Sequence, residues 1–324
     1  MRIINDETIQ TFYHMSDALR DVETMLVSIH KGESINPHRT VIDVPEKNGS
    51  VLYMPSSDGD EIAAVKVVSI FPENPSKALA TTQGAILLTE LETGKHVGMI
   101  SGSYLTRLRT GALSALSARH LARPESRILT VIGTGAMAFE QILGIVEVLP
   151  IEDIILVNRT TEKAIRFAER LMQFGVSAKI VVESDVRRAV EQADVVCCAT
   201  RSKEDVFSAD MVKPGTHIMG VGSYLPEMRE IPVELIPQAD AVFVDDLEGV
   251  RAEAGELLAA EAFGKWSFDQ VTGTLAELIA NGYERNKNAI TIFKSVGAAH
   301  FDLAVAKGVY KKARVLNIGE CIKF

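Results

Sequence analysis

The chain is poor in cysteine, and this bears on the redox environment of the protein. Only three cysteines occur among 324 residues, and such sparing use favours a reducing, intracellular environment. Cys197 and Cys198 are neighbours in an apolar run, so in a strand they point to opposite faces. We expect core residues rather than a redox pair, in a cytoplasmic protein.

Long apolar runs and an excess of positive charge are also missing. No apolar stretch reaches the roughly 20 residues that cross a bilayer as a helix. Residues 1–11 lack the basic start and apolar run of a secretory signal. The formal net charge of -9 argues against nucleic acid or an anionic membrane as the main partner. An anionic ligand must then be held by local positive charge.

Metal-ligand and hydrolase patterns are absent from the sequence as well. The histidines show no metal-ligand spacing, so we expect no metal site and assign core or surface roles to His38, His96, His120, His217 and His300. No Ser-His-Asp arrangement indicates a hydrolase. The chemistry must therefore be sought elsewhere.

The chain from residue 127 onward alternates between strand and helix patterns. Buried strands that alternate with helices are typical of a parallel sheet covered on both faces. We therefore expect an α/β fold, with a doubly wound Rossmann domain over residues 123–297. The expected strands are 128–132, 154–157, 178–182, 195–199, 217–221 and 241–244, and the expected helices are 136–148, 162–174 and 185–191.

The first part of the chain has a different pattern. A helical stretch at 16–30 precedes strand candidates separated by turn residues, as in a meander of hairpins. Helices at 104–122 and 298–313 follow, and the latter should pack back on the first domain. We expect a second, α+β domain formed by residues 1–122 and 298–324. Its strand candidates are 39–44, 51–55, 62–71, 85–90 and 96–101.

A glycine-rich turn follows the first strand of the α/β half. Gly133 permits a tight turn, Gly135 lets a pyrophosphate approach the backbone, and Ala138 keeps helix and strand close. The N-terminus of the next helix presents N–H groups to the phosphates. Because strands lie on both sides of this Gly-x-Gly-x-x-Ala motif, we predict a dinucleotide site.

The end of the second strand bears on which dinucleotide binds. NAD sites usually place an acid there, whereas this strand ends in Asn158, Arg159 and Thr160. A guanidinium and two neutral polar groups suit a 2′-phosphate, since arginine binds phosphate oxygens bidentately. We expect NADP(H) to be preferred, with NAD(H) also accepted. The alternative is that Arg159 only caps a loop in solvent.

Three basic residues stand out in the first part. Lys66 is the one charge in an apolar strand, which is costly unless it meets an anion or a cleft. Arg39 starts another expected strand, and Arg109 lies two residues before Gly111 in a helical stretch. By pattern alone each could be structural, but together they suit an α-carboxylate. Lys66 near two arginines should have a lowered pKa.

Several separate motifs resemble those of the ornithine cyclodeaminase and mu-crystallin family, in order along essentially the whole chain. They include the strand around Lys66 with Pro72-Glu-Asn-Pro75, Thr81-Thr-Gln-Gly-Ala85, Arg107-Leu-Arg-Thr-Gly-Ala112, Gly133-Thr-Gly-Ala-Met-Ala138, Gly220-Val-Gly222 and Phe293-Lys-Ser-Val-Gly297. The resemblance implies a homodimer whose first domain binds the substrate and supplies the interface. It also implies that Arg39, Lys66 and Arg109 hold the substrate carboxylate beside the nicotinamide.

The resemblance implies further contacts with the cofactor. It also bears on which activity of the family this chain has. The implied cofactor residues are Thr81, Thr82, Arg109, Ala136, Met137, Ala199, Thr200, Val221 and Ser295, besides those of the glycine turn and strand end. Cyclodeaminases of the family carry two acids for the ornithine amine, and this chain has Tyr224 and the Leu52-Tyr-Met-Pro55 stretch there. Asp302, in the last expected helix, has two interpretations. It faces the crevice, or it has the preferred structural role, in which it caps the helix or pairs with Lys294 or Lys307.

We therefore expect an oxidoreductase that reduces a cyclic ketimine carboxylate to L-proline or L-pipecolate, with Lys66 as the catalytic residue. The substrate would be a small imino or amino acid. Alternatives are an alanine or opine-type dehydrogenase, an ornithine cyclodeaminase, and a non-catalytic NADPH-binding protein similar to mu-crystallin.

Overall fold

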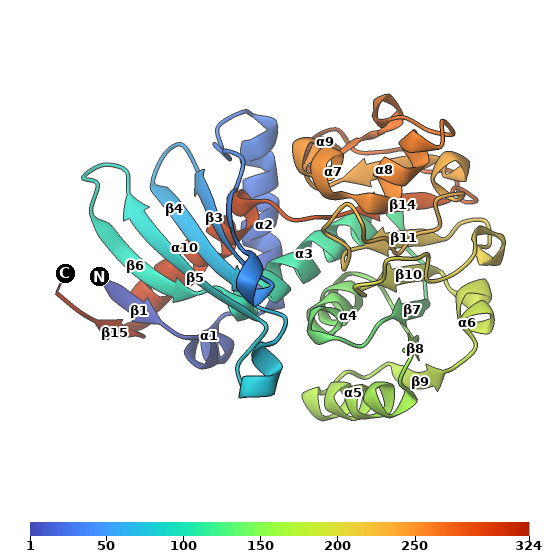
Figure 1. Cartoon of the computed structure of the whole chain (residues 1–324), viewed down its shortest axis with the longest axis horizontal. Helices are drawn as coiled ribbons and strands as arrows, with labels where there is room; N and C mark the ends of the chain where they lie inside the picture. Colours follow the sequence, from blue (N-terminus) through green and yellow to red (C-terminus); the bar gives the residue numbers. More distant parts are fainter. Residues whose placement is uncertain (324) are drawn as a thin grey trace. The chain divides into compact units, whose positions relative to one another are not determined.

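The computed structural model describes residues 1–323 and divides the chain into two compact units. Unit 1 comprises Met1–Arg109 and the chain from Ala298 onward, and unit 2 comprises Thr110–Gly297. The chain therefore begins and ends in the same unit (Figure 1). The division falls inside helix α3 (Ser103–Leu121). A domain boundary after residue 122, as the sequence predicts, stays a prediction.

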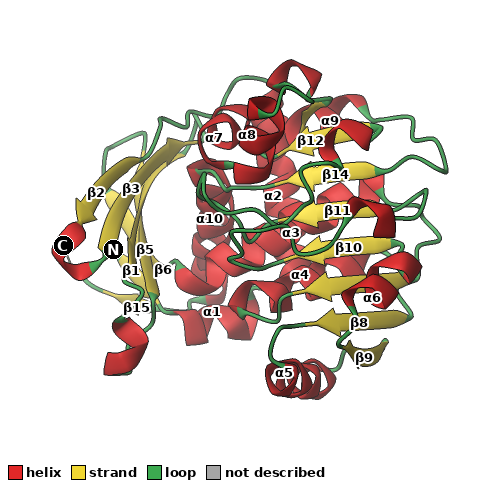
Figure 2. Ribbon diagram, turned by 45° about the vertical axis from the view of Figure 1, so that its right-hand side comes forward, coloured by secondary structure: helices red, strands yellow, loops and turns green. Residues whose placement is uncertain are grey.

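Unit 1 is built on a seven-stranded sheet in the order β15-β1-β6-β5-β4-β3-β2 (Figure 2). The strands from β2 to β6 form the predicted antiparallel meander, and β1 pairs with β6 in parallel. β1 and β15 are too short for a sequence pattern to predict. The strands are β1 (Arg2–Ile4), β2 (Thr40–Val44), β3 (Gly49–Ser57), β4 (Ile62–Ile70), β5 (Thr82–Glu90), β6 (His96–Ser101) and β15 (Glu320–Cys321).

One face of this sheet is covered by the C-terminal helix. Helix α10 (Ala299–Leu316) lies against β3 to β6 and also against α2 (Met15–His30), while α1 (Asp6–Phe12) precedes α2. Because α10 has neighbours on two sides, its first eight residues (299–306) are all buried, whereas its last turns carry lysines and an arginine. His300 and Asp302, near its start, are the buried polar residues of this helix.

The opposite face of the same sheet is apolar but partly exposed. Along β4, fully buried residues alternate with half-buried ones such as Val65 and Val67. Val67 pairs with Tyr53, and Val65 pairs with Leu87, which in turn pairs with Met99. Directly paired residues share a face, and Tyr53 and Met99 are each 39% exposed. Such an apolar patch is typical of an interaction surface.

Unit 2 is a parallel sheet in the order β13-β12-β14-β11-β10-β7-β8-β9. The chain starts at β7 and winds outward in both directions, so the strand order reverses between β7 and β10. This confirms the predicted doubly wound Rossmann fold. The strands are β7 (Ile128–Ile132), β8 (Asp153–Val157), β9 (Lys179–Glu183), β10 (Val195–Cys198), β11 (His217–Gly220), β12 (Ala241–Val244), β13 (Gly273–Thr274) and β14 (Thr291–Lys294).

Helices cross between these strands and shield the sheet. The sequence pattern correctly predicts the three helices that follow β7, β8 and β9. It does not predict the four-residue strand β14, whose residues are all buried. Besides α3, the helices are α4 (Ala136–Val148), α5 (Thr161–Phe174), α6 (Val186–Gln192), α7 (Leu247–Glu253), α8 (Gly255–Ala262) and α9 (Leu275–Asn281). Cys197 and Cys198 lie fully buried in β10, as expected of core residues.

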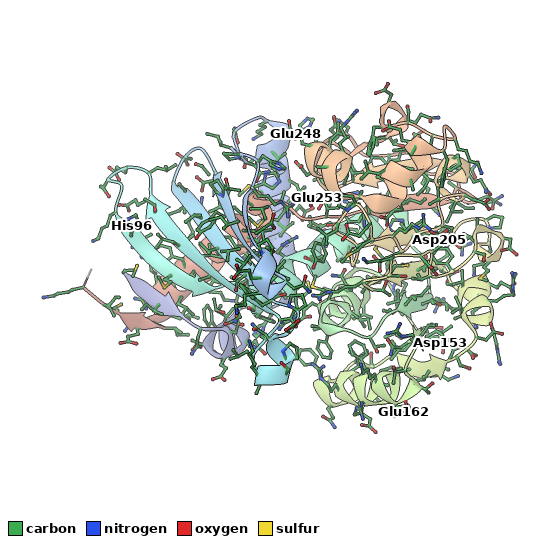
Figure 3. The ribbon with its side chains drawn as sticks, in the orientation of Figure 1. His96, Asp153, Glu162, Asp205, Glu248 and Glu253 are labelled. Atoms are coloured by element: carbon green, nitrogen blue, oxygen red, sulfur yellow. The ribbon has the colours of Figure 1, made fainter. Side chains whose placement is uncertain are left out.

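Charged side chains lie at the ends of several elements of unit 2 (Figure 3). Asp153 starts β8, and Glu162 lies in the first turn of α5, where the helix dipole favours an acid.

Within residues 1–323, no helix has the length and apolar character needed to cross a membrane.

Candidate active site

The glycine turn between β7 and α4 has the conformation that the motif requires. Gly133 has a φ of 95°, which favours glycine, and its N–H donates to the carbonyl of Val157 at 2.8 Å. Gly135 precedes α4 and has no side-chain cap, and a Cβ built there meets no atom within 4 Å. The first N–H groups of α4 therefore lack a side-chain cap beside open space, which fits an anionic pyrophosphate.

The end of β8 is tied to this turn by Asn158. Its Oδ1 accepts from the Thr134 N–H at 3.3 Å, and its Nδ2 donates to the carbonyl of Thr160 at 2.9 Å. Arg159 is exposed and makes no hydrogen bond or ion pair with another residue in the described part of the chain. Its guanidinium is thus available to a ligand, while the Asn158 amide holds the two loops together.

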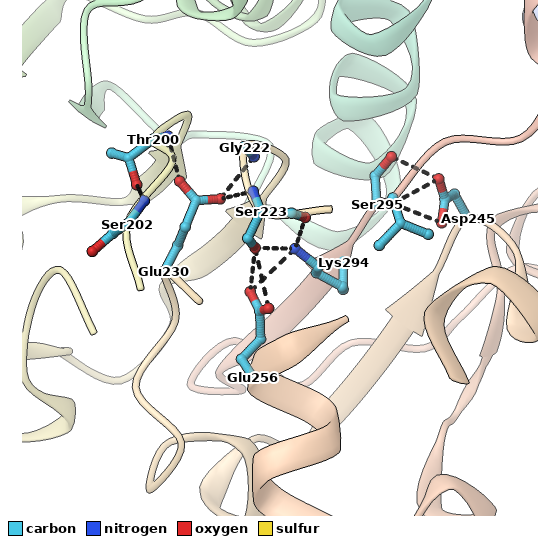
Figure 4. Close-up of polar contacts among 10 residues, drawn as sticks. Thr200, Ser202, Gly222, Ser223, Glu230, Asp245, Glu256, Lys294 and Ser295 are labelled. Carbon is cyan, nitrogen blue, oxygen red and sulfur yellow. Dashed lines mark hydrogen bonds and ion pairs between the residues drawn. The ribbon is translucent and has the colours of Figure 1, made fainter. Parts of the chain in front are cut away.

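A buried carboxylate fixes the loops that follow β10 and β11 (Figure 4). Glu230 accepts hydrogen bonds from the backbone N–H groups of Thr200, Gly222 (2.7 Å) and Ser223 (3.0 Å). Burial raises the pKa of Glu230, and the neighbouring Glu256 adds to this, whereas Lys294 opposes it. The two loops carry three of the predicted cofactor residues, which are Ala199, Thr200 and Val221.

A buried ion pair between Lys294 and Glu256 connects the loop after β11 to β14. Lys294 pairs with Glu256 at 3.2 Å and donates to the carbonyl of Ser223 at 2.7 Å, and Lys294 and Glu256 are fully buried. Ser295 donates its hydroxyl to Asp245 at 2.7 Å (Figure 4). The carboxyl ends of adjacent strands β10, β11 and β14 are therefore held rigidly by charge-assisted hydrogen bonds.

Unit 1 contains a separate buried cluster around Lys66. Its Nζ lies 2.8 Å from Oδ1 of Asp302 and donates to the Thr106 hydroxyl at 2.7 Å. Arg109 Nε lies 3.4 Å from the same Oδ1. β4 supplies the lysine, α3 supplies Thr106 and Arg109, and α10 supplies the aspartate. Lys66, Arg109 and Asp302 are at most 5% exposed.

Positive charge exceeds negative charge in this cluster. Burial lowers the pKa of Lys66, and the charges of Arg109 and Arg39 lower it further, against the opposing effect of Asp302. The pKa of Asp302 is lowered: burial would raise it, but Arg109 and Lys66 outweigh burial. Burial and the charge of Arg109 lower the pKa of His300 to about 4, so its ring is neutral at pH 7. An anion would balance the surplus.

The structure brings the three predicted cations together in unit 1 and lowers the pKa of Lys66 in the expected direction. Thr81 precedes β5 and Thr82 begins it.

The expectation that Asp302 pairs with Lys294 or Lys307 is wrong. Lys294 pairs with Glu256, and Lys307 pairs with Asp58 and Glu61, because five residues along a helix turn its side chain away from that of Asp302.

Sequence reasoning missed Thr106, and it did not assign His300, Asp302 or Glu230 to these groups. Thr106 lies one turn before Arg109 on α3, and that spacing is the signal that could have found it. His300 and Asp302 come near Lys66 only through the packing of α10 on the sheet. Glu230 follows a loop without regular structure, so no periodic pattern marks it. Within residues 1–323, no group of three His, Cys, Asp or Glu residues could hold a metal ion.

Comparison with known proteins agrees with this architecture. The chain is 35% identical to the Delta(1)-pyrroline-2-carboxylate reductase of Bacillus cereus, over 100% of both chains. The solved structure of the Thermococcus litoralis Delta(1)-pyrroline-2-carboxylate reductase, in complex with NADH and L-proline, has a TM-score of 0.94 at 32% identity, covering 99% of this chain and 100% of that one. An archaeal alanine dehydrogenase dimer with bound NAD has a TM-score of 0.93 at 31% identity, covering 100% and 99%. The profile of the ornithine cyclodeaminase/mu-crystallin family matches residues 2–316. This chain belongs to the ornithine cyclodeaminase/mu-crystallin family.

Proposed function

We propose that this chain is an NAD(P)H-dependent reductase of a cyclic ketimine carboxylate, 1-pyrroline-2-carboxylate or 1-piperideine-2-carboxylate, with L-proline or L-pipecolate as product. The observation that carries the proposal is the buried cluster of Lys66 and Arg109, with Arg39 nearby, whose surplus positive charge calls for a carboxylate. The similarity to pyrroline-carboxylate reductases over the whole chain supports it.

In this proposal the residues of unit 1 bind and polarise the substrate. Arg39 and Arg109 hold the carboxylate, since guanidinium groups bind carboxylates bidentately. Lys66 adds positive charge, and its lowered pKa makes Nζ a better proton donor near neutral pH. The bound nicotinamide supplies the hydride, and the chain contributes orientation and electrostatics.

Unit 2 is the proposed dinucleotide-binding domain. The open Gly135 backbone and the N-terminus of α4 suit the pyrophosphate. NAD or NADH is bound in the two similar structures. We propose a preference for NADP(H), because the end of β8 offers the exposed Arg159 and no acid for the ribose 2′-hydroxyl.

Unit 1 is the proposed dimerisation domain. The partly exposed apolar face of its sheet, with Tyr53, Val67 and Met99, is the proposed interface of a homodimer. The dimer of the similar archaeal alanine dehydrogenase supports this.

Alanine dehydrogenase is the second candidate, because that relative has the same fold at 31% identity. One spectrophotometric assay separates the two. NADPH and NADH oxidation would be followed with 1-pyrroline-2-carboxylate, 1-piperideine-2-carboxylate, or pyruvate plus ammonia. We expect turnover with a cyclic imine, and turnover with pyruvate and ammonia alone would reject the ketimine proposal. Tight NADPH binding without turnover on any substrate would indicate a non-catalytic binding protein.

A further inference from the structure

Asp302 carries one oxygen that the described chain leaves without a donor. Three groups, from Lys66, Thr106 and Arg109, all approach Oδ1, at 2.8, 3.2 and 3.4 Å. Oδ2 has no hydrogen-bond partner among residues 1–323, although the side chain is fully buried. A buried carboxylate oxygen without a donor is costly. A donor from outside the chain would remove that cost.

The charges around Asp302 restrict what this donor is. Lys66 on β4, Arg109 on α3 and Arg39 before β2 are cationic, and His300 on α10 is neutral because its pKa is lowered to about 4. A ligand carboxylate suits the two arginines. A cationic group on the same ligand would be repelled by these side chains unless an anionic oxygen faced it, and Oδ2 of Asp302 is such an oxygen.

We propose that Oδ2 of Asp302 accepts a hydrogen bond from the protonated ring nitrogen of the cyclic amino acid. The amino acid carries its carboxylate and its ring nitrogen on the same α-carbon, so one cluster would bind both. The arginines hold the first group, and Asp302 holds the second. This inference rests on the proposed function and assigns the group that recognises the substrate nitrogen.

A purely structural role of Asp302 predicts a different change in ligand affinity. If the carboxylate only holds Lys66 and Arg109 in place, its loss weakens every ligand that carries the carboxylate by the same factor. If Oδ2 binds the nitrogen, the loss depends on whether the ligand has that nitrogen. Two ligands that differ only at this atom separate these roles.

The experiment compares the binding of L-proline with that of cyclopentanecarboxylate, which has a methylene group in place of the ring nitrogen. Asp302→Asn keeps an oxygen for the donors on Oδ1 and puts an amide NH₂ in place of Oδ2. Affinities are measured by calorimetry in saturating NADH, where L-proline is not turned over. We expect L-proline to bind at least about tenfold more weakly to the variant, as for a lost hydrogen bond to a charged group, and cyclopentanecarboxylate to change less than about twofold.

Asp58→Asn is the matched control. Asp58 is also a buried carboxylate of unit 1 paired with a lysine, Lys307, so its loss reports on the general effect of removing such a pair. We expect it to leave the ratio of the two affinities unchanged. Equal weakening of both ligands by Asp302→Asn, or an unchanged affinity for L-proline, would overturn the assignment and leave the proposed function standing. If the wild-type protein binds neither ligand, the proposed function fails and the assignment fails with it.

A second measurement on the wild-type protein does not depend on the variant folding. Tetrahydrofuran-2-carboxylate places an oxygen at the ring-nitrogen position, and its lone pairs would face Oδ2. We expect it to bind several-fold more weakly than cyclopentanecarboxylate. Equal or tighter binding of the oxygen analogue would contradict a carboxylate oxygen at that position.

Discussion

Lys66 lies on the inward side of β4 because residues two apart in a strand share a face. Ile62, Ala64 and Val68 are buried on the same side, so the strand carries the lysine into an apolar interior. A lysine there is tolerated only with a compensating anion, and Asp302 supplies it. The cost of burying a lysine supports the proposal that Lys66 serves binding or catalysis.

Replacing Arg109 by alanine should lower kcat/KM for the imine strongly. The variant loses the proposed donor to the substrate carboxylate and leaves Asp302 with fewer partners. Truncation of such a buried charge pair costs about 2–5 kcal/mol. Steady-state NADPH oxidation measures the effect. Arg107→Ala is the control, because the Arg107 side chain lies over the ring of Tyr104, three residues earlier on α3, and outside the Lys66 cluster. An unchanged kcat/KM for Arg109→Ala would exclude Arg109 from substrate binding.

Replacing Arg159 by glutamate should shift the cofactor preference toward NADH. The carboxylate would repel the 2′-phosphate of NADPH and could accept from the 2′-hydroxyl of NADH. We expect the ratio of kcat/KM for NADPH to that for NADH to fall at least about tenfold, as for one lost charge-assisted contact. Arg166→Glu, on the exposed side of α5, is the charge-matched control. An unmoved ratio would mean that Arg159 only caps its loop.

At the scale of elements, the glycines at the start of α4 and within it serve two purposes. A Cβ at Gly144 would lie 2.5 Å from the carbonyl oxygen of Gly111, so this glycine lets α4 pack closely on α3. Gly135 has a φ of -81° and open space beside it. One position thus serves packing, and the other leaves room for a ligand.

The two glycines should respond differently to the same change. Gly144→Ala should lower the Tm, because forcing backbone apart costs about 1–3 kcal/mol. Gly135→Ala should leave the Tm nearly unchanged and raise the KM for NADPH several-fold, because the new methyl group occupies the space for the pyrophosphate. Thermal unfolding and cofactor titration of both variants check this. A normal KM in Gly135→Ala would contradict the proposed phosphate site.

His217 joins three elements of unit 2 and should make its stability depend on pH. The ring contacts Thr291 of β14 at 2.9 Å and Ser117 of α3 at 3.3 Å from its place in β11. Burial and the charge of Arg285 lower the pKa of His217 from 6.5 to about 3. Between pH 6.5 and about pH 3, the His217 ring is therefore protonated in the unfolded chain but neutral in the folded chain. The free energy of unfolding consequently falls as the pH drops through this window.

Between pH 6.5 and pH 5, His217 should account for a loss of about 2 kcal/mol in the free energy of unfolding. Urea unfolding at both pH values would show a smaller loss for His217→Gln than for the wild-type protein. His96→Gln, at an exposed position of β6, should behave as the wild type does. Parallel losses in all three proteins would assign the acid sensitivity to other groups.

At the scale of the whole molecule, the apolar sheet face of unit 1 should determine the oligomeric state. Val67→Glu would place a charge in the centre of that face, which an interface would have to desolvate. Sedimentation velocity should show a dimer for the wild-type protein and a monomer for the variant. Val315→Glu, at a position 86% exposed on α10, should remain dimeric. A dimeric Val67→Glu protein would place the interface elsewhere.

The sequence predicted the local features of both units because these depend on short-range patterns. The alternation of strands and helices and the spacing of the glycine turn follow from repeats of two and 3.6 residues and from backbone sterics. The three cations were also found from the sequence, since a charge such as Lys66 in an apolar strand is visible without a structure. The short strands β1, β14 and β15 carry too few residues for such a pattern.

Only tertiary structure decided which partners these residues have. Asp302 lies 236 positions from Lys66 along the chain, and no repeat connects them. They meet because α10 packs on β4, so the hydrophobic burial of a helix selects the counter-ion of the lysine. The three backbone donors gathered by Glu230 likewise depend on the order of parallel strands. Sequence spacing therefore determined the elements and their charges, while packing between distant segments determined which charges share a site.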